Sequence, residues 1–185
     1  MHYFKKIRNK FTLICSILFS INAFSMEQKI EISDVKLNFF DGHYFLSYHQ
    51  SISLLSEARV AASKGIPFNF LATAKILQNN KYGFRKKILS KEFYFKLKYK
   101  SLLKKYMVSD IKGQKSFFDN IDDALKKLSY IKLIIGPSIE LNEGTLELKT
   151  KLDKKYLPKA LQINFNNKSW DVESELTRIE IGRLN

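Results

Sequence analysis

Residues 35–48, Val-Lys-Leu-Asn-Phe-Phe-Asp-Gly-His-Tyr-Phe-Leu-Ser-Tyr, have the pattern of a β-hairpin. Val35, Leu37 and Phe39 alternate with other residues, as side chains on one face of a strand do. Asp41-Gly42 then separates this run from a second one, and Asp-Gly between two such runs is the strongest short-range hairpin signal. The sequence therefore predicts two antiparallel strands joined by a tight turn.

The same alternation recurs along most of the chain. It predicts further strands at residues 68–76, 93–99, 102–108, 117–118, 131–135, 139–141, 146–152, 160–165 and 170–176. Turns are expected at Asn79-Asn80, Lys112-Gly113, Glu143-Gly144 and Asn166-Asn167.

Two short helices interrupt the strands. The first has Ser53 as its expected cap and Gly65 as its stop. The second has Asp119 or Asn120 as its cap and continues to Leu128. Many antiparallel strands with two short helices define an α+β domain, mostly antiparallel β-sheet or sandwich. Both halves follow the order hairpin, helix, strand, strand, which gives the hypothesis of a tandem ββαββ pseudo-repeat.

The first 25 residues have the pattern of a secretory signal peptide. Four basic residues precede the apolar run 11–21, and the small residues Ala23 and Ser25 follow it. We therefore predict cleavage after Ser25, which places residues 26–185 in the periplasm or outside the cell as a single domain. The alternative is an uncut membrane anchor, but the apolar run is much shorter than the roughly 20 residues that a bilayer crossing needs.

The charge of the chain changes with that cleavage. The 185 residues include 32 Lys+Arg and 18 Asp+Glu, a formal charge of +14. Removal of the four basic residues leaves 28 against 18, a formal charge of +10. The only cysteine, Cys15, leaves as well, so the remaining chain has neither a disulfide framework nor a cysteine-based zinc site. Its composition fits an oxidising compartment.

An ordered set of short motifs runs from residue 41 to residue 174. They are Asp41-Gly42-His43-Tyr44, residues 61–70 with Gly65-Ile66-Pro67, residues 97–102 with Tyr106-Met107-Val108, residues 118–125, Leu152-Asp153 with residues 157–162, and Trp170 with Ser174. Together they resemble the domain of unknown function 4390 family, exported proteins of Gram-negative bacteria without an assigned activity. The sequence departs from the family at Tyr82-Gly83-Phe84-Arg85, where a tryptophan-rich stretch is usual, and at Ala160, where proline is usual. The resemblance implies export and an envelope role, and it loosely associates the chain with membrane sensor kinases.

Residues that could catalyse a reaction or bind a metal do not form a recognisable constellation. His43 and His49 lie six residues apart on one strand face, about 20 Å from each other, so one zinc ion cannot take both. Asp122 and Asp123 are adjacent helix positions and do not face each other. The sequence contains no G-x-S-x-G motif and no glycine-rich phosphate loop. We therefore predict a protein without enzymatic activity, cofactor or metal. The alternative is a hydrolase of cell-wall or lipid material, with its site at a strand end near Asp153 or His43.

The candidate binding residues are Tyr94, Lys96, Lys98 and Lys100, which alternate along one strand and so share one face. In the cytoplasm such a face would indicate nucleic acid. The signal peptide argues against that partner and favours an anionic envelope surface, such as lipid headgroups, or an envelope protein. Composition offers a non-functional alternative, since 27 of the 32 basic residues are lysine and residues of A/T-rich codons are plentiful.

Overall fold

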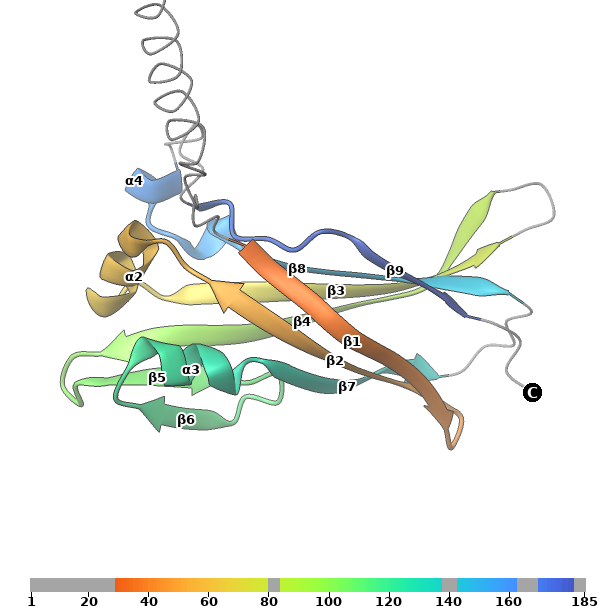
Figure 1. The fold of residues 1–185 in the computed structure, drawn as a ribbon, viewed down its shortest axis with the longest axis horizontal. Helices are drawn as coiled ribbons and strands as arrows, with labels where there is room; N and C mark the ends of the chain where they lie inside the picture. Colours follow the sequence, from red (N-terminus) through yellow and green to blue (C-terminus); the bar gives the residue numbers. More distant parts are fainter. Residues whose placement is uncertain (1–28, 80–83, 138–142, 163–169, 182–185) are drawn as a thin grey trace, which may run out of the picture.

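The computed structural model describes residues 29–79, 84–137, 143–162 and 170–181 (Figure 1). In chain order the elements are β1 (Lys29–Phe40), β2 (His43–Ser53), α2 (Ser56–Ser63), β3 (Phe68–Asn79), β4 (Arg85–Lys100), β5 (Lys105–Ser109), β6 (Lys115–Phe118), α3 (Ile121–Lys127), β7 (Tyr130–Pro137), β8 (Gly144–Leu152), the 3-10 turn η1 (Lys154–Tyr156), α4 (Lys159–Gln162) and β9 (Thr177–Ile181).

The strands form two antiparallel sheets. The smaller has the order β1-β2-β7 and the larger the order β6-β5-β4-β3-β8-β9. The smaller sheet crosses one face of the larger, with α2 and α3 at the same end of the sandwich (Figure 1). This arrangement confirms the predicted α+β class, mostly antiparallel.

The core lies between the sheets and under the helices. Around α2 and α3 it includes Phe70 and Phe95, whose rings stack with centroids 5.3 Å apart. At the other end Tyr48 and Leu46 of β2 pack with β3 and β8. Every buried member of both clusters falls between Ile30 and Ile181. A chain beginning at residue 26 therefore carries the whole described core.

The predicted hairpin at residues 35–48 is confirmed. Phe40 pairs with His43, and the two turn residues, Asp41 and Gly42, have φ angles of 47° and 69°. Two consecutive positive φ angles define the type I′ turn that matches the twist of a hairpin. The strands are longer than the pattern predicted, and a bulge interrupts β1 between Ser33 and Lys36.

The second predicted helix is confirmed, and the first begins later than predicted. The side chain of Asn120 caps α3 by accepting a hydrogen bond from the Asp123 amide at 2.8 Å. Ser53 was predicted as the cap of the first helix, which is wrong. It pairs with Lys29 as the last residue of β2, because the ladder with β1 continues past the buried Ile52. The stop at Gly65, with φ of 88°, is confirmed.

Three predicted strands need correction, each for a local reason. Residues 101–104 form a turn before β5 rather than a strand, because the chain reverses there to pair β5 with β4. Residues 159–162 form α4, since Pro158 starts a turn of good helix formers and its carbonyl accepts from the amides of Leu161 and Gln162.

The third correction concerns residues 170–176, which make only isolated bridges. Within this segment the backbone of Ser174 forms a β-bridge with Ile30 of β1, and the backbone of Glu173 forms one with Lys151 of β8. The segment therefore links β1 of the smaller sheet to β8 of the larger sheet, and its chain forms a regular strand only from Thr177 onward. Residues 139–141 and 163–165 of the predicted strands, and the predicted turn residues Asn80 and Asn166-Asn167, lie outside the described residues.

The predicted order ββαββ occurs twice, as β1β2α2β3β4 and β5β6α3β7β8. In each half the chain changes sheet after the helix: β3 enters the larger sheet, and β7 enters the smaller one. The halves then differ, because β4 stays beside β3 whereas β8 leaves β7 and pairs with β3.

Candidate binding surface

The larger sheet has an inner face, which packs against the smaller sheet, and an outer face. On β4 the inner residues include Phe95, which pairs with Phe70. Tyr94, Lys96, Lys98 and Lys100 occupy the alternate positions and so lie on the outer face. The structure thus places the four sequence-predicted residues together on one surface.

Neighbouring strands add two lysines to this surface. Lys115 of β6 lies in one cross-strand row with Ser109 and Lys96. Lys151 of β8 lies in a row with Leu71 and Tyr94. We call this group the lysine face; its members are Tyr94, Lys96, Lys98, Lys100, Lys115 and Lys151.

The five ammonium groups of the lysine face are electrostatically unsatisfied. Within the described ranges, none of them has a carboxylate within 4.0 Å, whereas Lys105 pairs with Asp119 at 3.1 Å and Lys149 with Glu173 at 3.0 Å. Alternate positions on a strand are about 7 Å apart. At that distance two like charges in water repel by roughly 0.6 kcal/mol. An anionic surface that binds across several of these lysines relieves this repulsion.

The lysine side chains also cover apolar atoms. Leu71 and Met107 face outward, yet both are buried. Each is flanked in its cross-strand row by residues of the lysine face: Leu71 by Tyr94 and Lys151, and Met107 by Lys98. Long lysine stems lie along such apolar surface while the ammonium stays in water. The ammonium groups are therefore held above the sheet.

Tyr94 is the aromatic member of the lysine face and is 47% exposed. Its hydroxyl donates a hydrogen bond to Glu92 at 3.1 Å. That bond, with a smaller effect of desolvation, raises the pKa of Tyr94. The bond holds the Tyr94 hydroxyl beside the Glu92 carboxylate, which places one negative charge at this end of the face.

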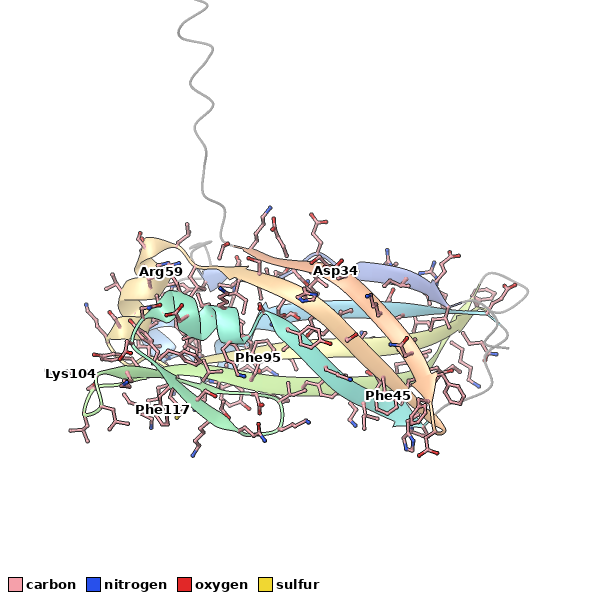
Figure 2. All side chains as sticks on the ribbon, turned by 60° about the horizontal axis from the view of Figure 1, so that its bottom comes forward. Asp34, Phe45, Arg59, Phe95, Lys104 and Phe117 are labelled. Atoms are coloured by element: carbon pink, nitrogen blue, oxygen red, sulfur yellow. The ribbon has the colours of Figure 1, made fainter. Side chains whose placement is uncertain are left out.

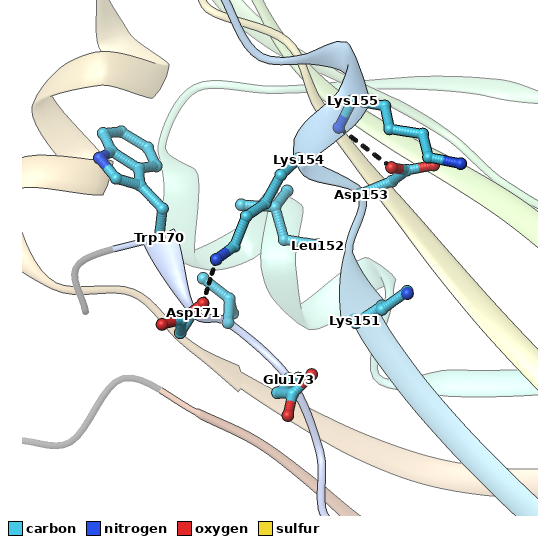
Figure 3. A pocket seen from close by; sticks show the side chains of 9 residues that line it. Lys151, Leu152, Asp153, Lys154, Lys155, Trp170, Asp171 and Glu173 are labelled. Carbon is cyan, nitrogen blue, oxygen red and sulfur yellow. Dashed lines mark hydrogen bonds and ion pairs between the residues drawn. The ribbon is translucent and has the colours of Figure 1, made fainter. Parts of the chain in front are cut away.

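A shallow hollow of about 260 Å³ lies where β8 ends (Figure 3). Asp153, one of the two residues considered as a hydrolase site, lines it. Its carboxylates already have partners: Asp171 pairs with Lys154, and Glu173 with Lys149. Asp153 caps η1 by accepting from the Lys155 amide, and its side chain points away from Trp170 and Asp171. Trp170 is buried and packs edge-to-face on Phe68, with ring centroids 6.1 Å apart. The hollow therefore presents structural contacts rather than a pair of free carboxylates.

The two histidines of β2 lie on the outer face of the smaller sheet. A ring nitrogen of His43 lies 2.7 Å from the Asp41 carbonyl oxygen in the hairpin turn. His49 packs against Tyr130, with ring centroids 5.0 Å apart, and lies 3.6 Å from Asp34. Among the residues that the structure describes, no three His, Cys, Asp or Glu side chains gather as a metal-binding group.

The structure also reveals exposed residues that the sequence interpretation missed. Leu102 and Leu103 were assigned to a strand but lie in the turn between β4 and β5, next to Lys100 and Lys104. The available signal was the break in alternation at Ser101-Leu102-Leu103, where two apolar residues follow each other between lysines.

The fold and this surface define an α+β sandwich with one basic outer face. A family model described as "Domain of unknown function (DUF4390)" matches residues 27–180, and the chain belongs to that family. No curated protein and no solved structure matches the chain. Among the described residues, no helix is long and apolar enough to cross a membrane.

Proposed function

We propose that this chain is an exported, non-enzymatic module of the cell envelope that binds anionic surfaces through the lysine face. The observation that carries the proposal is the set of five lysines on one sheet face without carboxylate partners among the described residues. The predicted signal peptide supports an extracytoplasmic location, where anionic lipid headgroups and cell-wall acids are the abundant polyanions.

The form of the surface supports a broad ligand rather than a small molecule. The lysines lie on β6, β4 and β8, so the lysine face spans the five adjacent strands from β6 to β8. Small-molecule sites are instead concave and mostly apolar. A flat array of cations above a sheet suits a surface or polymer with many negative charges, whose counterions are released on binding.

Vesicle sedimentation tests this proposal. At low ionic strength we expect the processed protein to pellet with vesicles of phosphatidylglycerol and phosphatidylcholine, and not with phosphatidylcholine alone. Because the Debye length falls from about 10 Å at 0.1 M salt to about 3 Å at 1 M, affinity should fall about tenfold or more over that range. Equal binding to both vesicle types, or none to either at low salt, contradicts the proposal.

Export is tested separately by the mass of the protein recovered from the periplasm of a Gram-negative host that expresses the full sequence. We expect an intact mass corresponding to residues 26–185, since small residues precede the predicted cut after Ser25. A Ser25→Lys variant provides the control and should accumulate uncut. Recovery of the wild-type chain only in the cytoplasm, with residues 1–25 attached, contradicts the prediction.

A further inference from the structure

The turn between β4 and β5, residues 101–104, presents two leucines to solvent at one end of the sandwich. Leu102 is fully exposed (101%) and Leu103 is 57% exposed. The turn has regular geometry: the Leu103 amide donates to the Lys100 carbonyl at 3.0 Å, and the Lys104 amide to the Ser101 carbonyl at 3.2 Å. Figure 2 shows Lys104 at the extreme end of the molecule, where this turn projects.

The residue types of the turn are unfavourable for folding alone. Lys104 has φ of 50°, in the left-handed region that glycine or asparagine adopts more easily. Two exposed leucines contribute little to a turn in water. Moving them into an apolar environment, however, is favourable by about 1.5–3 kcal/mol each. The turn therefore has a composition that a second, apolar phase would explain.

Lysines lie on both sides of the two leucines in the chain. Lys104 directly follows the pair, Lys100 stands two positions before it, and Lys98 is the next outward residue of β4. Lys98 shares its cross-strand row with Met107 and Phe117, and Phe117 is 45% exposed. The acid found close to the turn, Asp119, is paired with Lys105. An apolar tip with lysines beside it complements the boundary of an anionic bilayer, where lysines meet headgroups and leucines reach the acyl chains.

We propose that the Leu102-Leu103 turn inserts into the headgroup–acyl boundary of a bilayer that contains anionic phospholipid. The inference rests on the proposed function and deepens it, because it selects a lipid bilayer over soluble or cell-wall polyanions. The lysine face supplies attraction, and the two leucines supply an apolar contact that a soluble polymer does not offer.

A second exposed apolar group supplies the control. Phe40 is 72% exposed and lies at the tip of the β1–β2 hairpin, beside Asp41. The centroid of its ring lies 6.4 Å from that of Phe45. Figure 2 places Phe45 and Lys104 at opposite ends of the molecule. The β1–β2 hairpin belongs to the smaller sheet, which packs against the inner face of the larger sheet, whereas the lysine face is on the outer face. A flat bilayer that contacts the lysine face and the Leu102-Leu103 turn therefore does not reach Phe40.

The experiment places an environment-sensitive fluorophore on Leu102→Cys or, as the matched control, on Phe40→Cys. Both proteins are produced from the full sequence and exported, so that removal of residues 1–25 takes Cys15 away. With phosphatidylglycerol vesicles we expect a blue shift and quenching by brominated acyl chains for the label at residue 102, and an unchanged spectrum at residue 40. A shift at residue 40 instead overturns the inference.

A double variant, Leu102→Ser with Leu103→Ser, distinguishes the inference from the proposed function. We expect its affinity for anionic vesicles to fall about tenfold or more, because serine removes the favourable free energy of transferring two leucine side chains from water to the acyl region. Its affinity for soluble polyglutamate should be unchanged. Two results would overturn insertion: an unchanged vesicle affinity of the double variant, or a label at residue 102 that keeps the spectrum it has in water although the protein binds vesicles. Either result leaves the proposed binding by the lysine face standing. Absence of vesicle binding by the wild-type protein overturns both proposals.

Discussion

Replacing Phe70 with alanine will lower the free energy of unfolding by about 4 kcal/mol, as core phenylalanine truncations typically do. Phe70 is fully buried in the middle of β3, the strand that pairs with both β4 and β8. Its ring stacks on Phe95 at 5.3 Å with an interplanar angle of 15°. Alanine would therefore remove the transfer free energy of a ring and leave a cavity at the centre of the larger sheet.

Urea unfolding followed by circular dichroism measures this loss. Phe117→Ala is the matched control, because it deletes the same ring from a 45% exposed position on the outer face. We expect the control to cost less than about 1 kcal/mol. Similar losses in the two variants would mean that Phe70 does not lie in the core, and would contradict the assignment of the inner face.

Raising the pH will destabilise the wild-type protein more than Tyr48→Phe. Tyr48 is buried in β2, and this burial raises the pKa of its hydroxyl to about 12, with a smaller lowering effect from the Thr150 hydroxyl. Although these two hydroxyls lie near each other, neither has a partner of hydrogen-bond geometry among the described residues. The Tyr48 hydroxyl therefore stays protonated in the folded state beyond the pH at which an exposed tyrosine ionises.

The sign follows from the raised pKa. The contribution of Tyr48 is fully present below about pH 10 and is lost as the pH rises through about 12, since only the unfolded chain releases its proton in that window. Between about pH 8 and pH 11 we expect the wild type to lose about 1.4 kcal/mol more than Tyr48→Phe. Urea unfolding at both pH values measures the difference. Parallel losses would show that Tyr48 is accessible to solvent in the folded state.

Tyr48→Phe also has an expected effect at neutral pH. Its free energy of unfolding should be unchanged or higher, because the substitution removes a buried hydroxyl that lacks a hydrogen bond among the described residues. A loss of several kcal/mol would instead indicate that the hydroxyl is satisfied in solution.

Local chemistry made several elements predictable. Asp41-Gly42 defines its own turn, and Asn120 caps α3 through a contact within three residues. The alternation of Tyr94, Lys96, Lys98 and Lys100 placed them on one face without knowledge of the fold, since the side-chain period of a strand is two. These predictions depend only on residues that are close in sequence.

Features that depend on distant pairing were not predictable from such patterns. Both β7 and β8 show the alternation of a strand, and that alternation does not indicate which of the two sheets each one joins. Lys115 and Lys151 join the lysine face only through the register of β6 and β8. The turn at residues 101–104 lacks Gly, Pro, Asn and Asp, so the break in alternation at Leu102-Leu103 was the one sign that the chain reverses there.

Vesicle binding by two triple variants of equal charge, measured at low ionic strength, shows whether the lysine face is the binding site. Lys96→Gln, Lys98→Gln and Lys100→Gln neutralise the lysine face, whereas Lys126→Gln, Lys127→Gln and Lys132→Gln neutralise three exposed lysines on α3 and the smaller sheet. A basic side chain at an anionic membrane contributes about 1 kcal/mol, so the first variant should lose about 100-fold in affinity for phosphatidylglycerol vesicles. The second should lose about threefold or less. Equal losses in the two variants would show that net charge alone draws the protein to the membrane, and would contradict a binding site on the lysine face.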